Sequence, residues 1–303
     1  MAAFIETIVA LRDACVDARA SQRTVGLVPT MGFLHEGHRS LMRAARAETD
    51  FVVVTIFVNP LQFGPSEDLG RYPRDLARDL EACAQEGVDA VFAPSVAEMY
   101  PQPPATTVHV AGLTDGLCGT HRPVHFDGVT TVVAKLFSIV GPCRAYFGRK
   151  DAQQAAVVTR MAADLDLPVE VVACPLVREP DGLALSSRNA YLSADDRRAA
   201  PILFRGLRAA ADAVVAGERD PLRLTALIRE LVATEPRVEL EYVEARDAAS
   251  IAPIERVEGQ VLLALAARLG DTRLIDNVGI SVVGDSVEVD LGTIFDDPIP
   301  VAP

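Results

Sequence analysis

The sequence lacks the features that mark several protein classes. Its 303 residues carry a formal net charge of −13 without any dense run of lysine and arginine, whereas nucleic-acid-binding proteins usually carry a basic stripe. The apolar run at residues 51–58 is far too short to cross a membrane. Residues 1–6 contain no basic segment leading into an apolar core, as a signal peptide would. We therefore predict a soluble cytoplasmic protein that has neither nucleic acid nor a membrane as a partner.

Cysteine is scarce and scattered. The five cysteines are far apart and odd in number, and no two of them form a Cys-x-x-Cys pair. A disulfide framework uses an even set, and structural zinc sites usually use such closely spaced pairs. The pattern argues against both, and a reducing cytoplasm fits it best.

Strand-like and helix-like segments alternate through the first part of the chain. Hydrophobic residues make up 50% of the chain, which is enough for a large core and suggests two domains. The alternation of strand-like and helix-like segments predicts an α/β fold built on an open parallel Rossmann-like sheet. The strand-like segments are residues 24–28, 51–58, 89–93, 144–147 and 169–172, and the helical patterns are residues 5–20, 38–48, 74–86, 128–140 and 153–165.

The pattern changes after residue 177. Two long helical patterns, at residues 194–216 and 221–234, are followed by strand-like segments at residues 240–246, 261–267 and 273–276. Helices followed by strands, without alternation, predict a smaller α+β C-terminal domain. The expected domains are residues 1–184 and 185–284, with a loosely ordered, proline-containing extension at residues 285–303.

Residues 25–38 carry the first candidate site. An apolar run, Pro29, two glycines and a helical pattern from about His38 predict a strand, a loop and a helix start. A helix start offers free N–H groups and a positive dipole end, which favour phosphate. His35 and His38 can donate hydrogen bonds to phosphate oxygens, and the positive end disfavours imidazolium, so at least one ring should be neutral. The alternative is a loop with two surface histidines.

Two familiar signatures are absent from the sequence. It has no His-Glu-x-x-His motif, and residues 148–151 have Asp151 where a P-loop needs Ser or Thr. Histidine-based binding of a nucleoside triphosphate remains. The loops at Pro29, Asn59 and Gly148 each follow a predicted strand, so we expect them to meet in one crevice beyond the carboxyl ends of the sheet.

Four motifs, in the same order, resemble those of one family. They lie at residues 29–38, 57–63, 147–154 and 181–189, and the first resembles the HIGH motif of the nucleotidyltransferase superfamily. Together they resemble the pantothenate synthetase (pantoate–β-alanine ligase) family, from near residue 5 to about residue 280. The resemblance implies ATP-dependent condensation of (R)-pantoate with β-alanine through a pantoyl-adenylate, with release of pyrophosphate and then AMP. It also implies Mg²⁺, a homodimer, a nucleotide- and pantoate-binding first domain and a second domain that closes as a lid.

The resemblance assigns roles to individual residues. It implies that His38 is a proton donor and that His35, Lys150 and Arg188 act on the phosphates. Lysine is a mobile point charge and arginine a planar fork, and both suit phosphate oxygens; the alternatives are solvated loop cations and, for the two serines of the last motif, ordinary turn residues. The residues implied in ATP binding are Met31, Gly32, Phe33, Leu34, His35, Glu36, Gly37, His38, Gly148, Arg149, Lys150, Asp151, Val177, Leu185, Ser186, Ser187 and Arg188.

Gln62, Gln154 and Met31 are implied in pantoate binding. A neutral amide can bind a carboxylate without lowering its nucleophilicity as a cation would, and the alternative for each glutamine is a surface loop residue. Asn59 either orders its loop or contacts β-alanine. Asp79 matches an acidic position near the metal and the phosphates, and it is either a Mg²⁺ ligand or a solvated helix carboxylate.

Three positions depart from the family pattern. Cys118 and Arg149 stand where the family usually has glutamate, and Arg78 stands where a second acid is common. The loss at Cys118 removes a carboxylate that could orient Arg122. Two other functions stay open: an adenylyltransferase that leaves AMP on its product, and a nucleotide-binding regulatory protein without the chemistry.

Overall fold

The computed structural model describes residues 2–65 and 67–295, and the chain divides into two compact units. Unit 1 comprises Met1–Cys174 and unit 2 comprises Pro175–Pro303. The division falls ahead of the boundary expected at residue 184. The segment that follows Pro175 belongs to unit 2 because its strand and its buried arginine, described below, bond within that unit.

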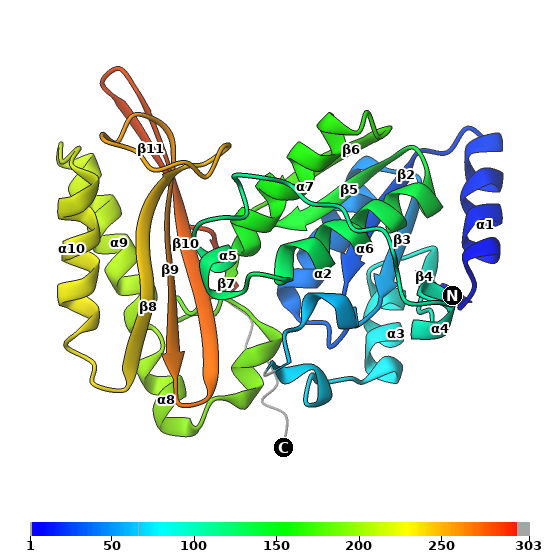
Figure 1. Ribbon diagram of the computed structural model, residues 1–303, viewed down its shortest axis with the longest axis horizontal. Helices are drawn as coiled ribbons and strands as arrows, with labels where there is room; N and C mark the ends of the chain where they lie inside the picture. Colours follow the sequence, from blue (N-terminus) through cyan, green and yellow to red (C-terminus); the bar gives the residue numbers. More distant parts are fainter. Residues whose placement is uncertain (1, 66, 296–303) are drawn as a thin grey trace. The chain divides into compact units, whose positions relative to one another are not determined.

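Unit 1 is built on a six-stranded parallel sheet (Figure 1). The strand order is β1-β4-β3-β2-β5-β6, which confirms the predicted open parallel α/β fold. From β2 the chain moves outward to β3 and β4, then returns to β5 on the other side of β2. The order therefore reverses between β2 and β5, where ligands of such sheets bind. The strands are β1 Ala3–Ile5, β2 Val25–Thr30, β3 Phe51–Ile56, β4 Ala90–Phe92, β5 Cys143–Gly148 and β6 Val169–Cys174.

The first four helices of unit 1 begin at residues whose side chains cap them. Thr7 and Asp75 cap the first and third helices through their side chains. Strand β1 was not expected, since the apolar pattern placed residue 5 in a helix; the helix instead begins after Thr7. The helices are α1 Ile8–Ala20, α2 Glu36–Glu48, α3 Leu76–Gln85, α4 Val96–Met99, α5 Cys118–His121, α6 His125–Val140 and α7 Ala152–Asp164, with 3-10 turns η1 Pro60–Gln62, η2 Asp68–Gly70 and η3 Arg149–Asp151.

Unit 2 has a four-stranded antiparallel sheet in the order β11-β10-β9-β8, covered on one face by α9 and α10 (Figure 1). This arrangement confirms the predicted α+β character. The helix predicted over residues 194–216 is in fact two helices, because the chain turns at Pro201 before α9. The elements are β7 Val177–Arg178, η4 Ser187–Tyr191, α8 Ala194–Ala199, α9 Ile202–Val215, α10 Pro221–Val232, β8 Val238–Asp247, β9 Gly259–Leu269, β10 Thr272–Val283, β11 Ser286–Asp290 and β12 Thr293–Ile294.

A buried arginine joins β7 to the rest of unit 2. Arg178 is 0% exposed, and its guanidinium donates to the Asp276 carboxylate at 2.8 Å and to the Leu291 carbonyl at 2.5 Å. Strand β7 also pairs with β12. The ordered strands β11 and β12 correct the loosely ordered extension predicted from residue 285; its remainder, residues 296–303, lies outside the described residues.

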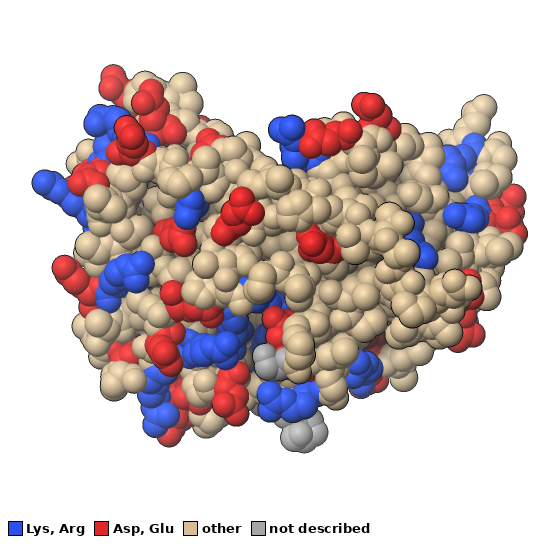
Figure 2. Space-filling model, viewed as in Figure 1, with Lys and Arg blue, Asp and Glu red and all other residues tan. Residues whose placement is uncertain are grey.

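Charges on the surface are mixed in sign. On the face shown in Figure 2, lysine and arginine atoms lie interspersed with aspartate and glutamate atoms. Across residues 2–65 and 67–295, no helix combines the length and the apolar character that a membrane span needs.

Candidate active site

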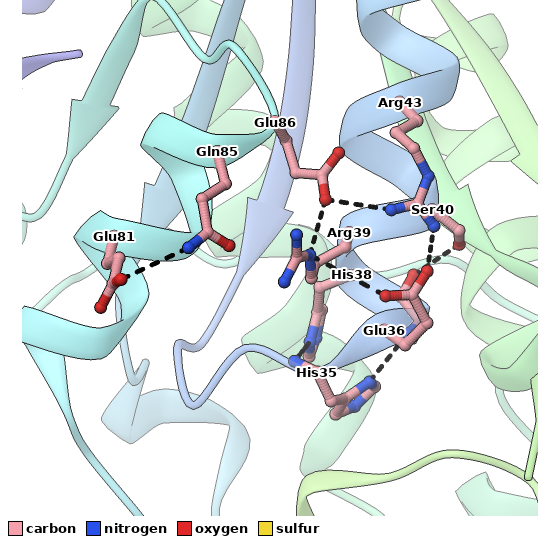
Figure 3. A network of polar contacts seen from close by, with 10 residues as sticks. His35, Glu36, His38, Arg39, Ser40, Arg43, Glu81, Gln85 and Glu86 are labelled. Atoms are coloured by element: carbon pink, nitrogen blue, oxygen red, sulfur yellow. Dashed lines mark hydrogen bonds and ion pairs between the residues drawn. The ribbon is translucent and has the colours of Figure 1, made fainter. Parts of the chain in front are cut away.

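Helix α2 begins at the two histidines, which cap it reciprocally (Figure 3). His35 is the N-cap residue, and its Nδ1 accepts a hydrogen bond from the N–H of Gly37 at 3.1 Å. The Nδ1 of His38 accepts from the N–H of His35 at 3.3 Å. The imidazoles thus fill the places that serine or threonine and glutamate take in an ordinary capping box. We call two segments together the phosphate side: the loop at the start of α2, and η3, which follows the neighbouring strand β5.

This capping decides which ring nitrogen carries the proton. A neutral imidazole whose Nδ1 accepts a hydrogen bond has its N–H at Nε2. Burial lowers the pKa of His35 well below its usual range, and the charges of His38, Lys150 and Arg78 act in the same direction. Burial also lowers the pKa of His38 to about 4, although Asp151 opposes the shift. Both rings are therefore neutral at pH 7, and each holds one N–H donor.

The backbone N–H groups ahead of α2 are largely used within the chain. The N–H of Gly32 donates to Thr30 Oγ1 at 3.1 Å, and the N–H groups of Phe33 and Leu34 donate to the Asp79 carboxylate. The sequence predicted free N–H groups for phosphate at this helix start. The two imidazoles add their Nε2–H groups as further donors of the motif.

Asp79, on α3, clamps the loop. Its Oδ2 and Oδ1 accept from the N–H groups of Phe33 and Leu34 at 2.8 and 2.7 Å. Gly32 and Phe33 have φ angles of +82° and +51°, and a Cβ at Gly32 would lie 2.9 Å from Asp79 Oδ2. Asp79 is 1% exposed, which corrects the solvated carboxylate considered from the sequence. Its burial raises its pKa, and the two N–H donors oppose that shift.

An ion-pair network joins α2 to the end of α3 (Figure 3). Arg39 Nε lies 2.6 Å and Arg43 Nη1 3.0 Å from Glu86 Oε1, and Arg43 also pairs with Glu36. Glu86 directly follows the helix that carries Asp79. The histidine motif is therefore held to α3 at two points, through the loop and through the helix.

Lys150 lies in η3, directly after β5. Its Nζ lies 3.8 Å from Asp151 Oδ2, and its charge lowers the pKa values of both His35 and His38. The guanidinium of Arg78 lies 5.3 Å from the centroid of the Phe33 ring. Two cations and two neutral imidazoles thus gather around this loop, an arrangement suited to a polyphosphate.

The amide side of the site consists of Asn59, Gln62 and Met31. Asn59 is 1% exposed and makes four hydrogen bonds. Its Oδ1 accepts from the Leu61 N–H at 3.3 Å and from the Tyr100 hydroxyl at 2.9 Å. Its Nδ2 donates to the carbonyl of residue 128 at 3.0 Å and to Gln62 Oε1 at 3.2 Å. The amide is saturated, which favours loop ordering over direct contact with β-alanine.

The Gln62 side chain, 8% exposed, links Asn59 to Met31, which directly follows β2. With its oxygen bonded to Asn59, its Nε2 donates to Met31 Sδ at 2.9 Å. The backbone carbonyl of Gln62 accepts from His125 Nδ1 at 2.9 Å and from Arg122 Nη2 at 3.3 Å. Two predicted pantoate ligands, Gln62 and Met31, are therefore in contact.

Gln153 and Gln154 have different surroundings. Gln153 is 6% exposed; its Oε1 accepts from the Cys118 N–H at 3.0 Å, and its Nε2 donates to the carbonyls of Leu113 and Gly116 at 2.9 and 2.8 Å. Gln154, the predicted ligand, is partly exposed, and its side chain forms no hydrogen bond with the described part of the chain. Gln153 supports the framework, and Gln154 has an amide available for substrate.

Arg122 is oriented although Cys118 replaces the usual glutamate. Its Nε and Nη2 donate to the Glu67 carboxylate at 2.7 and 2.6 Å. Burial acts to raise the pKa of Glu67, but the hydrogen bonds and charge of Arg122 outweigh it, so this pKa lies below its usual value. Glu67 thus orients Arg122 without a carboxylate at residue 118.

The remaining predicted ATP-binding residues lie in unit 2. Val177 in β7 accepts a backbone hydrogen bond from Leu185 at 3.0 Å, so these two predicted contacts are adjacent. Ser186 is the N-cap of η4, and its Oγ accepts from the Arg188 N–H at 3.2 Å. Ser187 is 8% exposed. One short segment of unit 2 therefore carries all five.

The predicted metal ligand, Asp79, is occupied by the loop that it clamps. Both of its oxygens accept backbone N–H groups. Among residues 2–65 and 67–295, no group of three or more His, Cys, Asp and Glu side chains could hold a metal ion. The side-chain donors of these described residues therefore do not form a metal site of their own.

Sequence reasoning missed three residues that shape the site. Tyr100, Gln153 and Glu67 bond to partners that are 41, 35 and 55 residues away. No local pattern marks such pairs. The sequence offers one signal, for Gln153. It directly precedes Gln154 at a helix start, and the side chains of two consecutive helical residues must point in different directions.

The site and the sheet together identify a class of protein. A parallel sheet that reverses its order beside a His-x-x-His helix start is the arrangement of a nucleotidyltransferase-type α/β enzyme. The profile of one family of ligases, described as pantoate-beta-alanine ligase, matches residues 3–279. The chain belongs to this family, and it is an enzyme of the ligase class.

Individual relatives agree with this assignment. The pantothenate synthetase of Moorella thermoacetica is 55% identical over 278 residues, which cover 92% of this chain and 98% of that protein. The solved pantothenate synthetase of Thermus thermophilus is 47% identical, with a TM-score of 0.86 over 91% of this chain and 98% of that one. The pantoate-beta-alanine ligase of Francisella tularensis, solved in complex with beta-gamma ATP and beta-alanine, is 32% identical, with a TM-score of 0.75 over 91% and 97% of the two chains.

Proposed function

We propose that this chain condenses (R)-pantoate with β-alanine in two steps, the first of which consumes ATP. In the first, a pantoate carboxylate oxygen attacks the α-phosphorus of ATP, and the bond to pyrophosphate breaks. In the second, the neutral amine of β-alanine attacks the acyl carbon of pantoyl-adenylate, and AMP leaves with the electrons of the acyl–oxygen bond. The amine loses its proton as the amide of pantothenate forms.

The phosphate side stabilises the charge that develops as pyrophosphate leaves. His35 and His38 donate Nε2–H hydrogen bonds to phosphate oxygens, and Lys150 adds a positive charge. Because the pKa of His38 is about 4, this ring acts at pH 7 as a neutral hydrogen-bond donor rather than as an imidazolium acid. That refines the proton-donor role implied by the resemblance. Donors held in place before the reaction are effective because they need no reorganisation.

The amide side binds pantoate. Gln62 offers an NH₂ group whose present partner, the Met31 thioether, is a weak acceptor that a substrate oxygen can replace. Gln154 offers a second, partly exposed amide. Neutral amides hold the carboxylate and the hydroxyls of pantoate without neutralising the nucleophile.

Several further roles belong to the same proposal. Val177, Leu185, Ser186, Ser187 and Arg188 contribute to ATP binding, and residues 185–284 act as a lid that excludes water from the adenylate. Mg²⁺ enters with ATP and is held mainly by phosphates and water. The chain functions as a homodimer in the cytoplasm, and its unpaired cysteines agree with a reducing compartment.

The reciprocal histidine caps carry the proposal, because they place two neutral N–H donors at the switch point of the sheet. The test mixes the protein with ATP, Mg²⁺, (R)-pantoate and β-alanine and omits each in turn, while AMP, pyrophosphate and pantothenate are measured. AMP and pantothenate should form in equal amounts only in the complete mixture. An adenylylated end product would instead indicate an adenylyltransferase, and ATP binding without turnover would indicate a regulatory protein.

A further inference from the structure

A tyrosine outside the proposed substrate contacts helps to anchor the asparagine that orients an amide within them. Tyr100 directly follows α4, and its hydroxyl bonds to Asn59 Oδ1 at 2.9 Å. We propose that Tyr100 is a positioning residue that acts through Asn59 to turn the NH₂ group of Gln62 toward the pantoate site. The inference rests on the proposed pantoate-binding role of Gln62.

The polarity of the Asn59 amide follows from backbone groups that can bond in one way only. The Leu61 N–H can only donate, so the atom 3.3 Å from it is Oδ1. The carbonyl of Gly128 can only accept, so the atom 3.0 Å from it is Nδ2. Because the neighbouring atom of Asn59 is an acceptor, the Tyr100 hydroxyl is the donor in their bond.

The polarity of Gln62 follows in turn. Asn59 directs its second Nδ2 hydrogen at Gln62, so the Gln62 atom at 3.2 Å must be Oε1. The NH₂ group of Gln62 is then the end that faces Met31. Gln62 is therefore set to recognise an acceptor oxygen of the substrate, such as a carboxylate oxygen, rather than a donor.

The surroundings of Tyr100 keep its hydroxyl in the donor role. The ring lies 6.1 Å from the Phe57 ring between centroids, and the Lys135 ammonium lies 5.3 Å from its centroid. Burial raises the pKa of Tyr100 to about 12, so the hydroxyl keeps its proton. The other anchor, Gly128, must be glycine, because a Cβ there would lie 2.3 Å from the Leu61 carbonyl oxygen.

Removal of the hydroxyl tests the inference against a matched control. Tyr100→Phe deletes one 2.9 Å hydrogen bond, and Tyr146→Phe deletes another of the same length, from the Tyr146 hydroxyl to Glu48 in the same unit. For Tyr100→Phe we expect the KM for pantoate to rise roughly fivefold, the effect of one neutral hydrogen bond. The KM for ATP should stay unchanged, and Tyr146→Phe should change neither KM.

A double-mutant cycle with Gln62→Ala separates positioning from general weakening of the fold. In the Gln62→Ala background, Tyr100→Phe should add no further rise in the KM for pantoate, because the group that it positions is gone. The inference is overturned if the two effects are additive, if the KM for ATP rises equally, or if Tyr100→Phe has no effect while Gln62→Ala has one. If Gln62→Ala itself leaves the KM for pantoate unchanged, the pantoate-binding role of Gln62 is wrong and the inference falls with it.

Discussion

The phosphate side and the amide side of the site are held in place by different means. The reciprocal caps of His35 and His38 join residues that are two or three positions apart. The Asn59 amide has one local partner, the Leu61 N–H, but its bonds to Tyr100 and Gly128 reach residues that are 41 and 69 positions away. The comparison shows that a motif with its own internal bonds can be recognised in the sequence, whereas an amide anchored by distant partners cannot be interpreted alone.

The contrast has one exception. The loop of the phosphate side also depends on Asp79, which is 46 residues from Phe33. Without that carboxylate, two backbone N–H groups and a left-handed turn would lose their support. The phosphate side therefore combines local capping with one long-range clamp.

The largest expected effect separates the two roles of His38. His38→Asn keeps an acceptor near the position of Nδ1 but removes the Nε2 donor, whereas His38→Gln places at N3 an amide that can both accept from the His35 N–H and donate. For His38→Asn we expect kcat to fall on the order of 100-fold or more, with little change in Tm. His38→Gln should retain more activity, with a Tm close to that of the wild type. Equal losses of activity in both variants would contradict the role of an N–H donor at this position.

A smaller effect distinguishes the two neighbouring glutamines. Gln154→Ala should raise the KM for pantoate about tenfold and leave the free energy of unfolding nearly unchanged. Gln153→Ala removes three buried hydrogen bonds and should lower the free energy of unfolding by about 1–3 kcal/mol, with a smaller change in KM. Steady-state kinetics and chemical denaturation of both variants provide the comparison. A reversed pattern would assign the ligand role to Gln153.

The smallest expected effect concerns acid stability. Burial lowers the pKa of His38 from 6.5 to about 4, and it lowers the pKa values of His35 and His125 as well. Below about pH 6.5 the unfolded chain binds protons that the folded chain does not, so the free energy of unfolding falls as the pH drops toward 4. Above pH 6.5 this contribution is fully present.

Thermal unfolding measured from about pH 4.5 to about pH 7.5 tests this dependence. This range covers most of the interval between the folded and the unfolded pKa of His38. The wild-type Tm should fall by several degrees on acidification, and His38→Asn should reduce the slope because one titrating group is gone. Carboxylates contribute to both proteins, so the difference between them isolates His38. Parallel curves for the two proteins would contradict a buried neutral imidazole at this position.

Much of the fold could be predicted because its signals are local. Strands β2, β3, β4 and β6 form from largely apolar segments that contain β-branched residues, and helices α2, α3 and α4 have side-chain caps. Failures occurred where tertiary contacts decided the outcome. Strand β1 forms because β4 offers a parallel partner, and β12 is ordered because β7 pairs with it. The break between α8 and α9 is different, because Pro201 is a local signal within a helical pattern that otherwise continues on both sides of it.

The sequence by itself determined the parallel sheet, the helix start at His35 and His38, and the family, since each of these depends on neighbouring residues and their order. Only the tertiary structure decided that both imidazoles are neutral, that Asp79 clamps a loop and that Glu67 orients Arg122. It also decided which end of the Gln62 amide faces the ligand. The physical reason is that burial and hydrogen-bond direction depend on groups brought together from distant segments, and an isolated residue type does not specify its partners.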